Sequence, residues 1–279
     1  MNGENTIKKD IEGAAGAAEQ ASNSRAFVAV ARAGFAVSGV LHVLIGIISI
    51  QLAFGDSGDA DQGGAIAQLA AQPAGYALIW IGAVACLALG LWEASSVVFG
   101  YRQATARKRL GKKLAAGGRG IVFLALAAGF ASFALGNRKD SGDSTSDASA
   151  RLMQMPGGSL LLLAVGAGIA VTGIVFAVRG VLRSFAKRLV LPASRPLRTA
   201  TVVLGVFGHV AKGIALFLLG LLFIVATLQS DPEESTGLDG ALKSVLAQPF
   251  GIYALVFIGV GLGCYGIYLV FKSRLAKMD

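Results

Sequence analysis

The sequence has little charge and little cysteine. Only 15% of its 279 residues are Asp, Glu, Lys or Arg, and it holds two cysteines, whereas soluble proteins carry roughly 25% charged residues. Two cysteines exclude a disulfide-stapled scaffold. The low charge and a mean hydropathy of +0.67 exclude a disordered chain and argue against a soluble enzyme. Apolar residues are abundant instead, with 54% AVILMFWYC and 38 glycines.

Six long apolar runs predict membrane-spanning helices. A spanning helix needs about 20 mostly apolar residues, and the runs that approach or exceed this length are 33–54, 75–99, 120–136, 157–178, 200–228 and 251–271. The third run is the shortest, and we expect it to extend back through Gly117 and Gly118. The runs are continuously apolar, without the alternation of barrel strands, so helices are favoured. The predicted fold class is all-α, a polytopic membrane protein with six transmembrane helices.

The basic residues predict the topology. Of the 25 Lys and Arg residues, 20 lie near the two ends of the chain and in the connections after the second and fourth runs. Such an excess marks the cytoplasmic side, so both termini are expected in the cytoplasm, and residues 1–26 read as a flexible tail without the apolar core of a signal peptide. Basic stretches beside spans attract anionic lipids, and we favour this interpretation over nucleic-acid binding.

The chain repeats one unit three times. The segments that begin the second helix of each unit align at offsets of 83 and 93 residues: Gln72-Pro73-Ala74-Gly75, Met155-Pro156-Gly157-Gly158 and Gln248-Pro249-Phe250-Gly251. The glycines that coincide in the second helices are Gly90, Gly173 and Gly266, and those in the first helices are Gly39, Gly120 and Gly213. The predicted repeats are 27–105, 113–187 and 200–279. Each crosses the membrane twice, which predicts parallel repeats around a pseudo-threefold axis along the membrane normal.

The repeated glycines and prolines have a structural interpretation. Glycine lets helix backbones approach closely in lipid, so we expect these positions to pack helices, with the lining of a path as the alternative. Pro73, Pro156 and Pro249 are expected in the first turn of a helix, where a missing N–H costs nothing. The stretches before the prolines, such as 65–71 and 241–247, are expected to form short interfacial helices.

The repeated pattern resembles a known family. The residues that carry the resemblance are Arg32-x-Gly34, Gly39, Gly46, Gly64-Ala65, Pro73-x-Gly75 and Gly90, echoed by Gly240-Ala241 and Pro249-x-Gly251. They resemble the bacterial, largely actinobacterial, integral membrane family of domain of unknown function 1206, over 32–271. The middle copy departs from it, with Asp147 and Met155 in place of Gly64 and Gln72. The resemblance implies a bacterial plasma membrane and transfers no catalytic residue.

Four ionisable residues lie within the predicted spans, and none is repeated in the other units: His42, Glu93, His209 and Lys212. An ionisable residue inside a membrane is a functional hypothesis. At about 1.5 Å per residue, Glu93 and Lys212 lie about 9 and 6 Å inward of the midplane, so a pair with His209 one turn away would form a charged gate or proton-linked site. The alternatives are a snorkelling lysine, packing histidines, proton chemistry at His42, or haem.

No constellation in the sequence indicates catalysis, a metal site or a cofactor. Cys86 and Cys264 are interpreted as small core residues, and the acidic outer loops as solvated charge. We therefore predict no enzyme, but a scaffold, accessory or lipid-interacting membrane protein. The alternative is a small-solute or proton-linked transporter with a polar site near Glu93 and Lys212. The expected partners are the bilayer, anionic lipids, and a membrane-protein partner or a second copy of the chain.

Overall fold

A computed structural model describes residues 25–99, 106–137, 141–190, 192–231 and 237–275. It separates into two compact units, described here one at a time. The smaller unit contains residues up to 35 and 76–136, and the larger contains 36–75 and 137–277. The predicted flexible tail, residues 1–26, lies almost wholly outside the described residues.

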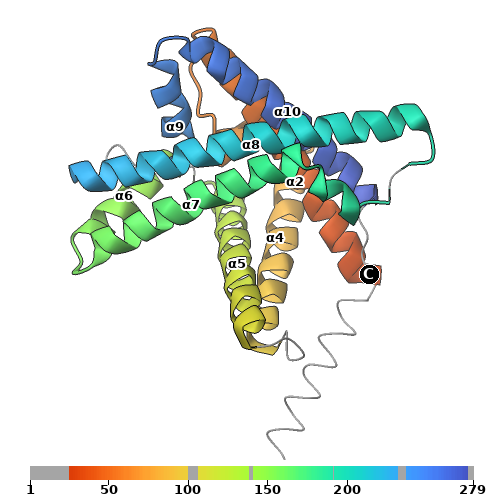
Figure 1. The fold of residues 1–279 in the computed structure, drawn as a ribbon, viewed down its shortest axis with the longest axis horizontal. Coiled ribbons are helices and arrows are strands. Elements are labelled where there is room, and N and C mark those ends of the chain that lie inside the picture. Colours follow the sequence, from red (N-terminus) through yellow and green to blue (C-terminus); the bar gives the residue numbers. More distant parts are fainter. Residues whose placement is uncertain (1–24, 100–105, 138–140, 191, 232–236, 276–279) are drawn as a thin grey trace, which may run out of the picture. The chain divides into compact units, whose positions relative to one another are not determined.

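The described residues form helices joined by turns (Figure 1). Six of these helices are long and apolar enough to cross a membrane: α2 (Arg25–Ala53), α4 (Gly75–Phe99), α5 (Ala106–Ala134), α7 (Gly158–Val181), α8 (Arg195–Gln229) and α10 (Gly251–Leu275). All six predicted spans are therefore present as helices, and the prediction of an all-α chain is confirmed. One shorter helix lies between the two long helices of each repeat. These shorter helices are α3 (Gln62–Ala70), α6 (Ser141–Met153) and α9 (Gly237–Leu246).

Three helices begin earlier than the hydropathy predicted. α2 starts at Arg25 and α5 at Ala106, both before the expected start of the run, and α8 starts at Arg195 with Pro196 in its first turn. The added turns contain Arg, Lys, Leu and Ala, which all favour helix. Hydropathy counts basic residues against a span, but a helix can begin in water before it enters the apolar layer. The predicted spans were therefore too short at these three ends.

The three repeated proline segments form the same turn. Ala74, Gly157 and Phe250 all have positive φ, at 63°, 78° and 65°. In each segment the N–H of the following glycine donates to the carbonyl three residues back, as in Gly75 to Gln72 at 2.9 Å. This is a type II turn, which favours Pro at its second position and needs positive φ at its third. The prolines thus stand in turns before the helices, and their expected placement in the first helical turn was wrong.

The short helices before these turns include both stretches expected to be helical. In the larger unit, α9 is tied to the loop after α2, because the buried N–H of Ala60 donates to the Asp239 carboxylate at 2.8 Å. Lys243 on α9 also pairs with Asp239 and with Asp59. Partial burial lowers the pKa of Lys243, but its hydrogen bond to Asp239 and the charges of Asp239 and Asp59 raise it more, so this pKa stands above its ordinary value.

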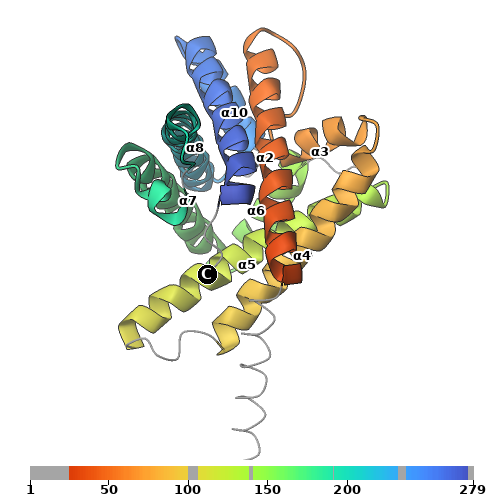
Figure 2. The same ribbon diagram turned by 90° about the vertical axis from the view of Figure 1, so that its right-hand side faces the viewer.

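In the larger unit, α7 and α8 lie side by side and antiparallel, as do α2 and α10 (Figure 2). A Cβ built on Gly173 or Gly213 would stand 2.6 Å from the carbonyl oxygen of the other glycine. Seven residues along, Gly166 and Gly220 make the next contact of the same pair. Both crossings rest on backbone against backbone, which only residues without a side chain permit.

The α2–α10 pair repeats this register. Gly39 lies against Gly266, and Gly46 lies against Gly259. In the smaller unit, α4 and α5 also pair antiparallel at the equivalent Gly90 and Gly120, but less closely. A Cβ on Gly120 would stand 3.6 Å from the carbonyl oxygen of Gly90. Each pair therefore joins the second helix of one repeat to the first helix of another.

Candidate functional site

The larger unit holds a lysine–histidine pair within its apolar helices. Lys212 of α8 lies with its Nζ 2.9 Å from Nε2 of His42 on α2. The His42 Nδ1 lies 2.7 Å from the carbonyl oxygen of Ser38. That oxygen can only accept, so Nδ1 carries the proton and Nε2 accepts from the lysine. The two side chains thus join α2 to α8 by a directed hydrogen bond.

Aromatic rings supply the rest of the surroundings of Lys212. Its Nζ lies 4.4 Å from the ring centroid of Tyr265 on α10 and 5.3 Å from that of Phe176 on α7. Tyr265 reaches this position because α10 crosses α8 at Gly208, where a Cβ would overlap the Tyr265 backbone. Within the described residues no carboxylate lies in ion-pair range of Lys212. The Lys212 ammonium is held by two aromatic rings and one neutral imidazole. The attraction between a cation and aromatic rings is stronger where water is excluded.

His209, one turn from Lys212 on α8, belongs to an aromatic cluster. Its ring stacks on Phe185 at 4.6 Å between centroids and meets Tyr268 edge-on at 5.0 Å. It is buried, and its Nδ1 lies 2.6 Å from the carbonyl oxygen of Gly205. This is the environment of a packing histidine. A haem held by both histidines would require Nε2 of His42, which Lys212 already occupies.

Glu93 pairs with a different residue from the one expected. In the smaller unit its carboxylate receives two hydrogen bonds from the Arg119 guanidinium, at 2.6 and 2.9 Å. The Glu93 side chain is 14% exposed and that of Arg119 is 50% exposed. The structure thus brings His42, His209 and Lys212 together in one unit and gives Glu93 a partner within the other. Arg119 could have been found in the sequence, because it occupies the repeat position of Lys212.

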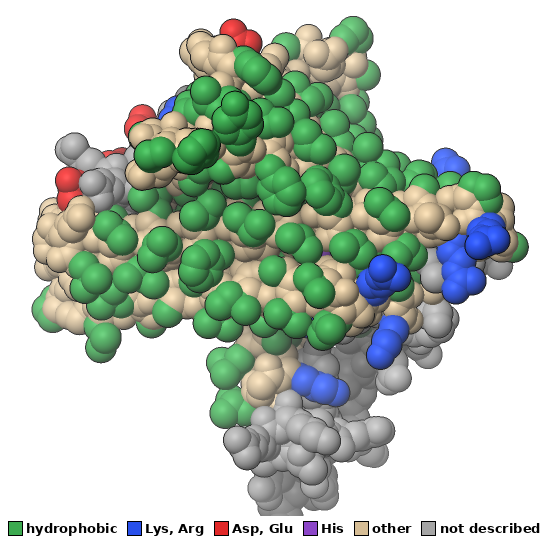
Figure 3. Space-filling model, turned by 45° about the horizontal axis from the view of Figure 1, so that its top comes forward, with side chains coloured by type: hydrophobic (Ala, Val, Ile, Leu, Met, Phe, Trp, Pro, Cys, Tyr) green, Lys and Arg blue, Asp and Glu red, His purple; other side chains and the backbone are tan. Residues whose placement is uncertain are grey.

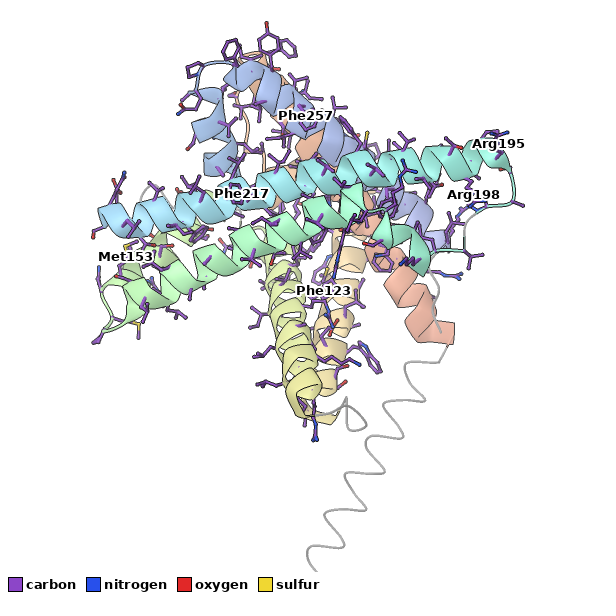
Figure 4. The ribbon with its side chains drawn as sticks, viewed as in Figure 1. Phe123, Met153, Arg195, Arg198, Phe217 and Phe257 are labelled. Atoms are coloured by element: carbon purple, nitrogen blue, oxygen red, sulfur yellow. The ribbon has the colours of Figure 1, made fainter. Side chains whose placement is uncertain are left out.

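Sequence reasoning missed a basic pocket at the start of α8. It has a volume of about 670 Å³ and lies between α8 and the segment after α7 that contains the short 3-10 helix η1 (Ser184–Arg188). Three arginines and an apolar wall line it: Arg183, Arg195, Arg198, Val202, Val203, Val206 and Phe207. Figure 4 shows Arg195 and Arg198 on the first turns of α8. The basic stretch was visible in the sequence, but the pocket forms only where η1 lies against α8.

A second pocket of about 650 Å³ lies between α8 and α9, toward the opposite end of α8. Its wall comes from the leucines and Val225 of α8, and its polar rim includes Gln229, Lys243, Ser244 and Gln248. Lys243 is already paired with acids, as described above. This pocket therefore offers apolar surface and neutral hydrogen-bonding groups, without a free charge of either sign.

The remaining chemical groups in the described part of the chain are few. Cys86 is buried on α4 and Cys264 is half-buried on α10. Among the described residues, no three His, Cys, Asp or Glu side chains gather as metal ligands would. What the larger unit can do chemically is donate and accept protons at Lys212 and His42, and bind anions at the arginines of the pocket.

Comparison with known proteins supports the threefold repetition of the chain. The family model described as Domain of Unknown Function (DUF1206) matches residues 33–100, 114–183 and 207–276. The chain is similar to the uncharacterized protein YxxB of Bacillus subtilis (strain 168), at 26% identity over 244 residues, 87% of this chain and 88% of that protein. No solved structure matches the chain. Three matched segments, each covering one pair of long apolar helices, place this chain in the DUF1206 family of membrane proteins.

Proposed function

We propose that this chain is a non-enzymatic, lipid-interacting membrane protein. One observation carries the proposal, namely the exposure of α7. It is the most apolar of the six candidate spans, yet only 17% of its most apolar stretch is buried, less than in any of the others. Its glycine stripe lies on α8, while its other sides present exposed apolar residues, among them Leu160, Val171, Ile174 and Val178. Figure 3 shows apolar side chains over much of this face. So much exposed apolar surface needs a cover of lipid or protein.

A spin label on α7 tests whether lipid or protein contacts its exposed apolar residues. We would place it at Val171→Cys, with Cys86 and Cys264 changed to Ser, in reconstituted protein. Lipid contact predicts strong relaxation by oxygen and weak relaxation by a water-soluble nickel complex. Protection from both reagents would mean that a protein partner covers α7, and this would contradict lipid contact there. A label at Leu110→Cys, an exposed position among the basic residues of α5, is the control that we expect to contact water.

We also propose that the three repeats are arranged around a pseudo-threefold axis, and the helix pairs support this. α4 pairs with α5, α7 with α8, and α10 with α2, so the second helix of each repeat meets the first helix of the next, and the third returns to the first. We also expect the basic connections and both termini to face the cytoplasm. A terminal tag that proves accessible from outside intact cells would contradict this orientation.

A proton-linked transporter is the second candidate, favoured by the Lys212–His42 contact. A proton donor and acceptor 2.9 Å apart inside apolar helices is a feature of proton pathways. Proteoliposomes with an internal pH dye test it. Transport predicts acidification under a proton gradient that Lys212→Met abolishes. Equal leak in protein-containing and empty vesicles would contradict this second function and leave the first intact.

A further inference from the structure

The basic pocket combines two kinds of surface along one helix. Arg195 and Arg198 line it from the first turns of α8, and Arg183 lines it from the residue before η1. Farther along α8 the wall is apolar and ends at Phe207. From Arg195 to Phe207 the helix rises by about 18 Å, at 1.5 Å per residue. Positive charge at one end and a long apolar wall behind it match an amphiphile with an anionic head.

The local fold holds the pocket open. Arg183 has φ 52°, a left-handed conformation that residues other than glycine seldom adopt. It ends α7, and η1 then places Phe185 against Gly205, where a Cβ would overlap the ring. The Val190 N–H donates to the Leu275 carbonyl at 2.8 Å and fixes the far side of the connection. A strained residue kept by its surroundings is characteristic of functional positions.

The charge of the pocket is unbalanced within the described residues. Its lining contains no acid, and none of the three arginines is in an ion pair there. Arginine suits phosphate because its planar fork donates two parallel hydrogen bonds. The ligand chemistry this lining would recognise is therefore a phosphate joined to an acyl chain.

The length of α8 sets the depth of the pocket. Its 35 residues span about 52 Å, whereas the hydrocarbon core is about 30 Å thick. The first turns of α8 thus reach beyond the core to the level of lipid head groups, where basic pockets between helices bind anionic lipids. We propose that the pocket lined by Arg183, Arg195, Arg198 and the adjacent valines is a binding site for one anionic phospholipid of the leaflet at the basic end of the helices. This inference rests on the proposed lipid contact and deepens it.

Lipid titration followed by native mass spectrometry of the detergent-purified full chain tests the site. The probes are phosphatidylglycerol and phosphatidylcholine with the same acyl chains. The variant Arg183→Gln/Arg195→Gln/Arg198→Gln removes three charges from the pocket. Its matched control, Arg109→Gln/Lys112→Gln/Lys113→Gln, removes three from the basic part of α5. Val203→Trp fills the apolar wall and leaves every arginine in place.

The expected result is one phosphatidylglycerol retained over phosphatidylcholine. The pocket variant should bind it at least tenfold more weakly, since lost charge-assisted contacts are each worth about a factor of ten. Val203→Trp should lose it as well, and the α5 control should stay within twofold of wild type. If the arginine variant fails to elute as a single species in size exclusion, Val203→Trp decides the outcome.

Three results would overturn the proposal. Equal binding of the two lipids would remove the anionic specificity, and equal loss in the α5 control would show a general effect of charge. Displacement of phosphatidylglycerol by millimolar glycerol 3-phosphate, with normal binding to Val203→Trp, would make the ligand a soluble phosphate. The spin label at Val171 measures lipid contact of α7 and does not depend on a head-group site. The pocket proposal and the proposed function can therefore fail independently of each other.

Discussion

The α4–α5 pair and the α7–α8 pair are built on one pattern with different results. Gly90 and Gly120 in the first pair occupy the repeat positions of Gly173 and Gly213 in the second. A Cβ on Gly213 would stand 2.6 Å from the opposite carbonyl oxygen, whereas on Gly120 the distance is 3.6 Å. The same glycine register thus brings α7 and α8 into backbone contact and leaves α4 and α5 farther apart.

The second crossing point explains the difference. In α7–α8 it consists of Gly166 and Gly220, but in α4–α5 the equivalent residues are Ala83 and Ala127, both buried. Two methyl groups keep the backbones apart, and the ring of Phe130 packs against Gly82 beside them. The spacing of small residues therefore fixes where two helices cross, while the second pair of residues fixes how closely.

The same comparison relates the polar residues. Arg119 and Lys212 are equivalent, and so are Glu93 and Phe176. In α4–α5 the cation meets a carboxylate, whereas in α7–α8 it meets an aromatic ring at 5.3 Å and bonds to His42 instead. Two of the three repeats have a cation at this position, with Ser38 in the first, and the partner of the cation differs between the two.

Phe176→Glu would place a carboxylate beside Lys212, at the position where Glu93 pairs with Arg119 in the other helix pair. We expect this variant to fold, because the new carboxylate meets an ammonium. In a Lys212→Met background the carboxylate would be buried without a counter-charge, and we expect a further loss of about 3–5 kcal/mol, the usual cost of a broken buried ion pair. Thermal unfolding of the four proteins of the cycle measures the difference. Equal losses in both backgrounds would show that residues 176 and 212 do not meet.

Gly213→Ala and Gly120→Ala should separate the two crossings. The first forces a methyl group into a backbone carbonyl and should cost about 1–3 kcal/mol, as overpacking does. The second meets the Cβ of Glu93 at 3.3 Å, and the gain of up to about 1 kcal/mol in helix propensity offsets the crowding. Thiol reactivity on heating measures both, with Cys264 reporting the larger unit and Cys86 the smaller. Equal destabilisation would contradict the difference in spacing.

His42→Leu tests the pair that belongs to the larger unit alone. It leaves the Lys212 ammonium without its acceptor, and we expect a loss of about 1–3 kcal/mol. Adding Lys212→Met removes the orphaned donor and should restore part of the stability. A double-mutant cycle on unfolding free energies measures the coupling. Additive losses would mean that the 2.9 Å contact contributes nothing.

Glu93→Gln should have the smallest effect, because Arg119 is half exposed and such pairs contribute about 0.2–1 kcal/mol. The loss should shrink in high salt and should couple to Arg119→Gln. With Lys212→Leu it should be additive. Coupling to Lys212 and additivity with Arg119 would favour the pair expected from depth alone. Arg109→Gln, on the same helix as Arg119, is the charge control.

Sequence reasoning found the helices and missed several contacts. Hydropathy located all six spans because a span depends only on length and composition. It set the starts of α2, α5 and α8 too late, since basic residues lower hydropathy without breaking a helix. Depth suggested Glu93 with Lys212, but depth is one coordinate, and a pair also needs the right helix and the right face. The repeat alignment already placed Arg119 at the position of Lys212, and it was the better guide.

The sequence alone determined the properties that depend on neighbours along the chain. These are the six apolar helices and the threefold repetition. Tertiary structure alone decided that Lys212 bonds to His42 and that three arginines share a pocket with an apolar wall. Those contacts depend on which helices cross and how each is rotated at the crossing, and crossing angles follow from backbone approach at glycines that lie far apart in sequence.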